Sequence, residues 1–187
     1  YRIKPQHNVL IDVSTFYNDY SNLRTNDLVS RSAPDPALLY KFNNSAEAES
    51  YGVEIASTWN VKPNWKLQAG YTFLTVDVHL QNGSTADSEL DEGRSPKTQF
   101  NARSHYYFAN NVALTNSLYF VDNLSRIGIP GYLRFDSRVS WEPRSGIELA
   151  LVGQNLFNDE HTEFSAPIYA EQNKIGRSIY GGVTWRF

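Results

Sequence analysis

Polar and apolar residues alternate along the last stretch of the chain, from Lys174 to Phe187. Most odd positions carry apolar side chains and most even positions carry polar ones, so the pattern repeats every two residues. This repeat is typical of a β-strand with two different faces, because successive strand side chains point to opposite sides. The stretch ends on Trp185 and Phe187, which would fray at the end of a soluble chain but can anchor a strand at a membrane interface.

Composition narrows the fold classes. Aromatic residues make up 14% of the 187 residues, the mean hydropathy is −0.49, and no apolar run has the length of a membrane-spanning helix. These features leave a β-rich soluble fold or a membrane barrel. The absence of cysteine excludes a disulfide framework and a thiolate metal site, and a net charge of −3 gives no electrostatic footprint for nucleic acid. A chain that begins with Tyr1 and contains no methionine is expected to have a processed or truncated start.

The alternation recurs upstream and predicts about eight strands. The predicted strands cover 9–20, 50–59, 65–76, 96–108, 112–121, 132–141, 147–157 and 174–187. Short turns are predicted at 60–64, 109–111 and 142–146, and longer polar loops at 21–48, 77–95, 122–131 and 158–173, the first with room for a short hairpin of its own around 38–42. Short and long connections that alternate in this way favour a membrane barrel over a β-sandwich.

Six large aromatic residues are predicted at the ends of strands, beside the short turns and on the apolar face. They are Trp59, Trp65, Phe108, Trp141, Trp185 and Phe187. Amphipathic rings at one height form the girdle expected where a barrel crosses the membrane interface, whereas a soluble core would place tryptophan centrally. The predicted fold is therefore all-β, an antiparallel transmembrane β-barrel segment of about eight strands.

The polar face is predicted to line the inside of the barrel. Its charged and titratable candidates for contact with a plug or a ligand are Arg103, His105, Arg134, Asp136, Arg138 and Arg177. In a narrow closed barrel such charges would need tight pairing, whereas a wide barrel can offer them to water or to a plug. Two interpretations of the arginines stay open: they meet plug carboxylates or an anionic ligand, or they pair with Asp136 and Glu148.

The sequence offers little sign of other chemistry. The four histidines, His7, His79, His105 and His161, are scattered along the chain. A hint of haem or metal contact comes only from the inward-facing His105 and from His161, which lies near Glu163. The acidic run Asp87, Glu89, Asp91 and Glu92 lacks the full spacing of a calcium loop, so a solvated loop is the favoured interpretation. No catalytic motif and no phosphate-binding loop is present, so we expect no enzyme activity, cofactor or metal site.

Several stretches together carry a family resemblance. They are Phe16 to Tyr20, the Tyr-Gly-Val-Glu-Ile within 49–55, the Asn-Leu-Phe-Asn-Asp within 152–159, and the terminal Trp-Arg-Phe. In these stretches the chain resembles the C-terminal part of the β-barrel of TonB-dependent outer-membrane receptors, and the resemblance covers nearly all of residues 1–187.

The resemblance implies a location and partners. It implies a 22-stranded barrel with a plugged lumen, in the outer membrane of a Gram-negative bacterium, of which this chain supplies roughly the last eight strands. Such a receptor imports a ferric siderophore, haem, cobalamin or a sugar, powered through TonB. The expected partners are outer-membrane lipid, the receptor's own plug domain, the TonB complex and an iron complex or similar nutrient, with the plug domain and earlier strands outside this chain.

Other functions stay open. An autonomous eight-stranded outer-membrane barrel with a structural or adhesive role is the first alternative. A soluble ligand-binding barrel of the lipocalin type is the second, and an outer-membrane hydrolase is a more distant one.

Overall fold

The computed structural model describes residues 1–31, 38–86, 92–166 and 170–187, which form two antiparallel sheets. The main sheet has nine strands: β1 (Arg2–Gln6), β2 (Val9–Arg31), β3 (Leu38–Lys62), β4 (Trp65–Leu80), β5 (Thr98–Tyr107), β6 (Val112–Val121), β7 (Tyr132–Arg144), β8 (Ile147–Gln154) and β11 (Ser178–Trp185). A second sheet pairs β9 (Glu160–Ala166) with β10 (Ala170–Gly176), and a 3-10 turn, η2, covers Ser125–Ile127. The predicted all-β, antiparallel fold is confirmed.

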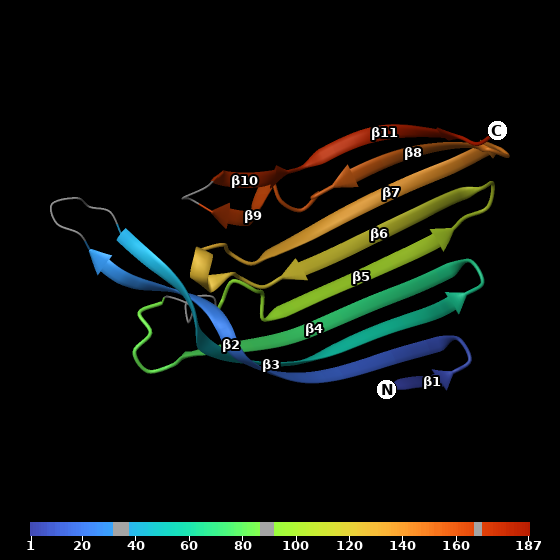
Figure 1. Ribbon diagram of the computed structural model, residues 1–187. Coiled ribbons are helices and arrows are strands. Elements are labelled where there is room, and N and C mark those ends of the chain that lie inside the picture. Colours follow the sequence, from blue (N-terminus) through green and yellow to red (C-terminus); the bar gives the residue numbers. More distant parts are fainter. Residues whose placement is uncertain (32–37, 87–91, 167–169) are drawn as a thin grey trace.

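The main sheet is a single curved layer (Figure 1). Each strand from β1 to β8 pairs with the next in the chain, and β8 pairs with β11. The short turns gather at one edge, together with the C-terminus, while the longer connections lie at the opposite edge (Figure 1). In the described residues β1 does not pair with β11, so the sheet is open. An open sheet of nine strands differs from the closed barrel expected for an autonomous eight-stranded barrel or a lipocalin-type barrel.

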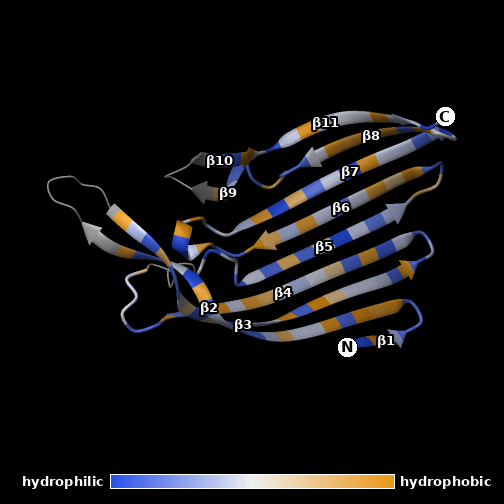
Figure 2. Cartoon of the chain, in the orientation of Figure 1, coloured by the Kyte–Doolittle hydropathy of each residue, from blue (hydrophilic) through white to orange (hydrophobic). Residues whose placement is uncertain are grey.

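Strand registers bring the apolar positions into phase across the sheet. Ile55 lies opposite Tyr71, Tyr71 opposite Phe100, Phe100 opposite Phe120, and Phe120 opposite Leu133. Because facing residues of paired strands point to the same side, this row defines one apolar face, here called the outer face. The opposite side is the inner face, and the two-residue alternation is visible as coloured bands along the strands (Figure 2).

Among the described residues, no second layer covers either face of the main sheet. The buried apolar residues are few and mostly small, and the one cluster among them joins Ala46, Ala48 and Val78 where β2, β3 and β4 run beyond the rest of the sheet. A soluble domain normally buries a sheet face against another layer. The two faces of this sheet therefore need covering by something other than the described residues. No helix among those residues is long and apolar enough to cross a membrane.

The predicted bounds agree best in the middle of the sheet. Strand β6 has the predicted bounds of 112–121, and β3, β4, β5, β7 and β8 overlap their predicted ranges. The predicted loop at 21–48 is wrong, because β2 continues to Arg31 and β3 already begins at Leu38, with 32–37 outside the described residues. Polar residues occupy both faces there, so no alternation marked the strands, which pair through their backbones.

The end of the chain also differs from the prediction. The predicted loop at 158–173 contains β9 and part of β10, and the predicted terminal strand is divided at Arg177 into β10 and β11. Strand β1, at the start of the chain, was not predicted. Short strands of mixed polarity leave too little periodicity to be recognised.

A polar cluster holds the segment after β4 against the extension of β2. Asp27 accepts hydrogen bonds from the Ser84 hydroxyl (2.5 Å), the Thr85 backbone N–H (2.8 Å) and the Thr25 hydroxyl (3.0 Å). These bonds, led by the one from Ser84, hold the pKa of the Asp27 carboxyl below its usual value. The ionised carboxylate thus ties a long connection to the strand extension.

Candidate functional site

Five of the six predicted inner residues share the inner face. Arg103 on β5 lies opposite Ser117 on β6, which lies opposite Asp136 on β7, and His105 is linked in the same way through Thr115 to Arg138. Arg134 lies two residues before Asp136 and so points to the same side. The sixth, Arg177, lies between β10 and β11 and forms an ion pair with Asp159 (2.9 Å). The structure thus sets Arg177 apart from the other five.

Two of these arginines are paired with carboxylates of the same face. Arg134 makes two hydrogen bonds to Asp136, at 2.9 and 2.8 Å, and Arg138 donates to Glu148 at 2.7 Å. Paired hydrogen bonds between a guanidinium and a carboxylate are strong and fix geometry. For Arg134 and Arg138, therefore, the interpretation of pairing with Asp136 and Glu148 is confirmed.

Arg103 has a different environment. Its guanidinium donates to the Ser117 hydroxyl (3.3 Å) and the Tyr119 hydroxyl (3.4 Å), and no carboxylate of the described residues forms an ion pair with it. A second cation, Lys66 on β4, lies opposite His105 on the same face. This part of the inner face carries positive charge that described carboxylates do not neutralise.

A cavity of about 180 Å³ opens beside Arg103, between β4, β5 and β6. Its lining residues are Gln68, Asn101, Ala102, Arg103 and Tyr119. They present amide, guanidinium and phenol groups, which can donate hydrogen bonds to an oxygen-rich group. We call this the Arg103 cavity; chemically it fits a carboxylate or another anion.

Asn155, directly after β8, is a structural residue that the sequence did not single out. It is fully buried and has a positive φ of 53°, and its backbone N–H donates to Asp136 (2.9 Å) while its side-chain amide donates to the Ile175 carbonyl (3.0 Å). Asparagine tolerates the left-handed conformation better than most residues. Asn155 therefore ends β8 and ties it to β7 and β10, which gives the Asn-Leu-Phe-Asn-Asp stretch a structural role.

His161 packs at the edge with the long connections. Its ring stacks on Tyr132 with 4.2 Å between ring centroids, and its Nε2 lies 2.8 Å from a Glu163 carboxylate oxygen. A cavity of about 320 Å³ lies beside it, between the start of β7 and β9, and the ion pair of Lys174 with Glu160 contributes to its lining. The contact of His161 with Glu163 is as the sequence suggested, and a polar cavity adjoins it.

The described residues hold no group of three histidine, cysteine, aspartate or glutamate side chains placed to bind a metal ion. Of the acidic run, residues 87–91 lie outside the described part of the chain. Glu92 is described, and its carboxylate accepts a hydrogen bond from the backbone N–H of Val78 at 2.5 Å. That bond gives Glu92 a structural partner.

The predicted girdle residues lie at or near the strand ends beside the short turns, and these turns gather at one edge of the sheet (Figure 1). Trp59 and Trp65 flank the β3–β4 turn, Phe108 follows β5, Trp141 lies near the end of β7, and Trp185 and Phe187 end the chain. Trp59, Trp141 and Trp185 are 44%, 46% and 72% exposed, and all three lie on the outer face. Contact of these rings with a membrane interface stays a prediction.

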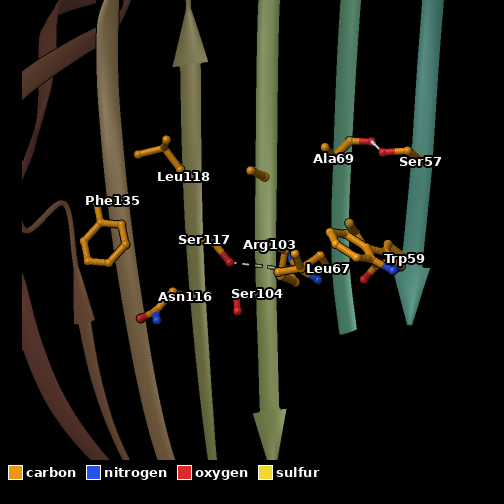
Figure 3. Close-up of a pocket in the computed structure, with 12 residues that line it drawn as sticks. Ser57, Trp59, Leu67, Ala69, Arg103, Ser104, Asn116, Ser117, Leu118 and Phe135 are labelled. Atoms are coloured by element: carbon orange, nitrogen blue, oxygen red, sulfur yellow. Dashed lines mark hydrogen bonds between the residues drawn. The ribbon is translucent and has the colours of Figure 1, made fainter. Parts of the chain in front are cut away.

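A hollow in the outer face crosses the middle strands of the main sheet. A groove of about 360 Å³ crosses it between Trp59 and Leu67 at one end and Leu118 and Phe135 at the other (Figure 3). The outer-face side chains between these ends are Asn116 and four small residues, Ser57, Ala69, Ala102 and Ser104. We call this the outer groove; it depends on the register of five strands, which no local pattern in the sequence reveals.

Comparison with known proteins identifies the family. The profile of the family described as TonB-dependent receptor-like β-barrel matches residues 3–156. The chain belongs to this family. The resemblance to the barrel of TonB-dependent receptors, which the sequence predicts, is thereby confirmed. The family is one of receptors and transporters.

Solved structures of receptors share the fold. The FrpB iron transporter from Neisseria meningitidis matches all of this chain with a TM-score of 0.76 at 14% identity. The ferripyoverdine receptor of the outer membrane of Pseudomonas aeruginosa matches 95% with a TM-score of 0.70 at 17% identity, and the ferric yersiniabactin uptake receptor FyuA from Yersinia pestis matches 96% with a TM-score of 0.68 at 16% identity. The match spans 30%, 25% and 27% of those chains, respectively. At these identities the likeness establishes the fold.

Proposed function

We propose that the chain forms part of the barrel wall of an outer-membrane transporter, which takes up a ferric siderophore or a similar nutrient through TonB. One observation carries the proposal: a single-layered sheet of this receptor family has an apolar outer face and a charged inner face, and described residues cover neither. Lipid outside and a plugged lumen inside would cover the two faces. The similar structures named as iron transporters and ferric siderophore receptors favour an iron complex as the nutrient.

Within such a receptor the chain is the C-terminal portion of the barrel. The outer edges of β1 and β11 carry backbone groups that would lack partners inside a membrane, where each unpaired group costs several kcal/mol. Pairing with further strands of a wide barrel removes that cost. The plug domain and the TonB-contacting segment then belong to other parts of the receptor.

Arg103 is the inner residue best suited to contact the plug or the ligand. Arg134 and Arg138 are already neutralised by their carboxylates, whereas Arg103 faces a cavity and has only hydroxyl partners. In the proposed transporter its guanidinium binds a plug carboxylate or an anionic group of the passing ligand. His105, held through its Nδ1 at 2.6 Å from the Thr115 hydroxyl, borders the same positive region.

Uptake by cells that carry the full-length receptor tests the function. A strain without its own siderophore receptors is supplied with radiolabelled iron bound to different siderophores. Haem is a further substrate, and copper complexes are included because a copper transporter shares this fold. The proposal predicts uptake of an iron complex that stops when TonB is deleted. Uptake that is the same without TonB, or none of any substrate by a correctly folded receptor, would contradict it.

Variants of Arg103 separate the inner-face contact from the general function. Arg103→Gln removes the charge and is expected to lower uptake, whereas Arg103→Lys keeps the charge and is expected to retain more of it. Heat-modifiable migration in gels checks that each variant folds. Wild-type uptake by Arg103→Gln would contradict the role of Arg103 and leave the transport function standing.

A further inference from the structure

The outer groove is a defined hollow in a face that is otherwise built of large apolar side chains. Ser57 lies opposite Ala69, and Ala69 lies opposite Ala102, so small side chains meet on three neighbouring strands. Figure 3 shows Trp59 and Leu67 at one end of the hollow and Phe135 at the other. Its volume of about 360 Å³ is within the range of pockets that bind small molecules.

The groove rises obliquely from the aromatic girdle. Trp59 is a girdle residue, whereas Phe135 lies six residues along β7 from Trp141, another girdle residue. Six residues of a strand cover about 20 Å, and a barrel strand tilted by about 40° rises about 15 Å over that length. The hydrocarbon core of a bilayer is about 30 Å thick, so the groove spans about the depth of one leaflet.

Several polar groups in and beside the groove have partners within the protein. The indole N–H of Trp65 donates to the Ser104 hydroxyl (3.1 Å), and the Ser137 hydroxyl donates to the side-chain Oδ1 of Asn116 (2.8 Å). Arg103 contributes to the lining, but its guanidinium bonds to inner-face hydroxyls. A groove without an available charge, bounded by leucine and aromatic rings, matches a hydrocarbon chain and offers little to a headgroup or a polar peptide.

We propose that the outer groove binds one acyl chain of a phospholipid from the leaflet on the short-turn side. The proposal rests on the membrane placement given under the proposed function. The headgroup of this lipid lies at the level of Trp59, and its chain runs obliquely across β4, β5 and β6 towards Phe135. Ordinary contact with the outer face would distribute acyl chains evenly, whereas the groove holds one chain in a fixed path.

The test uses the full-length receptor in bilayers that contain a phospholipid with a photoreactive group on its acyl chain. After illumination, mass spectrometry maps the labelled residues in the wild type, in Ala102→Phe, which fills the groove, and in Val183→Phe, which adds similar bulk to the outer face of β11. Heat-modifiable migration confirms folding, and Ala69→Leu is a second groove-filling variant if Ala102→Phe does not fold.

The wild type is expected to be labelled mainly at groove residues of β4, β5 and β6. Filling the groove is expected to reduce that labelling about tenfold, because the loss of contact for about two methylene groups of the acyl chain lowers its affinity by about that factor. Val183→Phe is expected to leave the labelling of the groove unchanged. Even labelling of the whole outer face, or crosslinks between receptor copies at the groove, would overturn the proposal and leave the membrane placement intact. Absence of acyl label from the entire outer face would instead refute the membrane placement on which both proposals rest.

Discussion

Adjacent arginine substitutions on β4 should change the free energy of unfolding by very different amounts if the two faces of the sheet meet lipid and lumen. Tyr71 lies on the outer face between Ile55 and Phe100, six residues from Trp65 in the girdle. Six strand residues tilted by about 40° place Tyr71 about 15 Å from the interface, near the middle of the bilayer. Arginine on the lipid face costs about 2–4 kcal/mol at that depth. Tyr71→Arg should therefore lower the folding equilibrium constant roughly 30- to 900-fold.

The neighbouring Thr72→Arg is the matched control. Thr72 points to the inner face, where it lies opposite Glu54, so an arginine at this position gains an opposite charge as its neighbour. Its effect on the free energy of unfolding should stay within about 1 kcal/mol. Both variants of the full-length receptor are unfolded with denaturant in lipid bilayers, with tryptophan fluorescence as the signal. Equal destabilisation by the two variants, or greater destabilisation by Thr72→Arg, would refute the assignment of the faces.

Three further predictions concern single contacts. Gly52→Ala should destabilise the receptor by about 1–3 kcal/mol, because its Cβ would lie 2.2 Å from a backbone oxygen and 2.7 Å from the Phe16 ring; Gly182→Ala, which meets open space, should be near neutral in the same unfolding assay. Asn155→Ala should destabilise more than Asn155→Gly, by about 1 kcal/mol, since glycine keeps the positive φ; equal effects would contradict this. The lowered pKa of Asp27 means that the ionised carboxylate stabilises the segment at Ser84 and Thr85 above the ordinary aspartate pKa. This stabilisation is lost as the pH falls through the pKa of Asp27 in the folded protein, so hydrogen exchange of the segment should accelerate only below about pH 4. Release of the segment near neutral pH would contradict the role of Asp27.

The sequence predicts the part of the sheet with one apolar and one polar face well, because two different faces impose a two-residue alternation there. Strand β6 was predicted with its observed bounds for this reason. Where both faces of the strands are polar, no alternation of side chains is required. The extension formed by 21–31 and 38–48 has polar residues on both sides, and its strands are specified by backbone pairing that no side-chain periodicity announces.

The inner face was predictable in part for a related reason. Alternation places Arg103, Arg134 and Arg138 on one side of the sheet, but their partners depend on register across strands. Pairing with Asp136 and Glu148 was one of two interpretations, and only the structure separates the neutralised arginines from Arg103. The outer groove also needs the register of several strands, so it emerges only from the folded sheet.

The most direct test of the two-faced wall is a spin-label scan along β6 in the full-length receptor, with one label at each position from 112 to 121. Lipid-dissolved oxygen should collide with labels at the even positions, which lie on the outer face with Leu114 and Leu118, and should be excluded from the odd positions, which lie with Ser117 on the inner face. Oxygen contact that does not alternate, or that is absent from the even positions, would contradict the account.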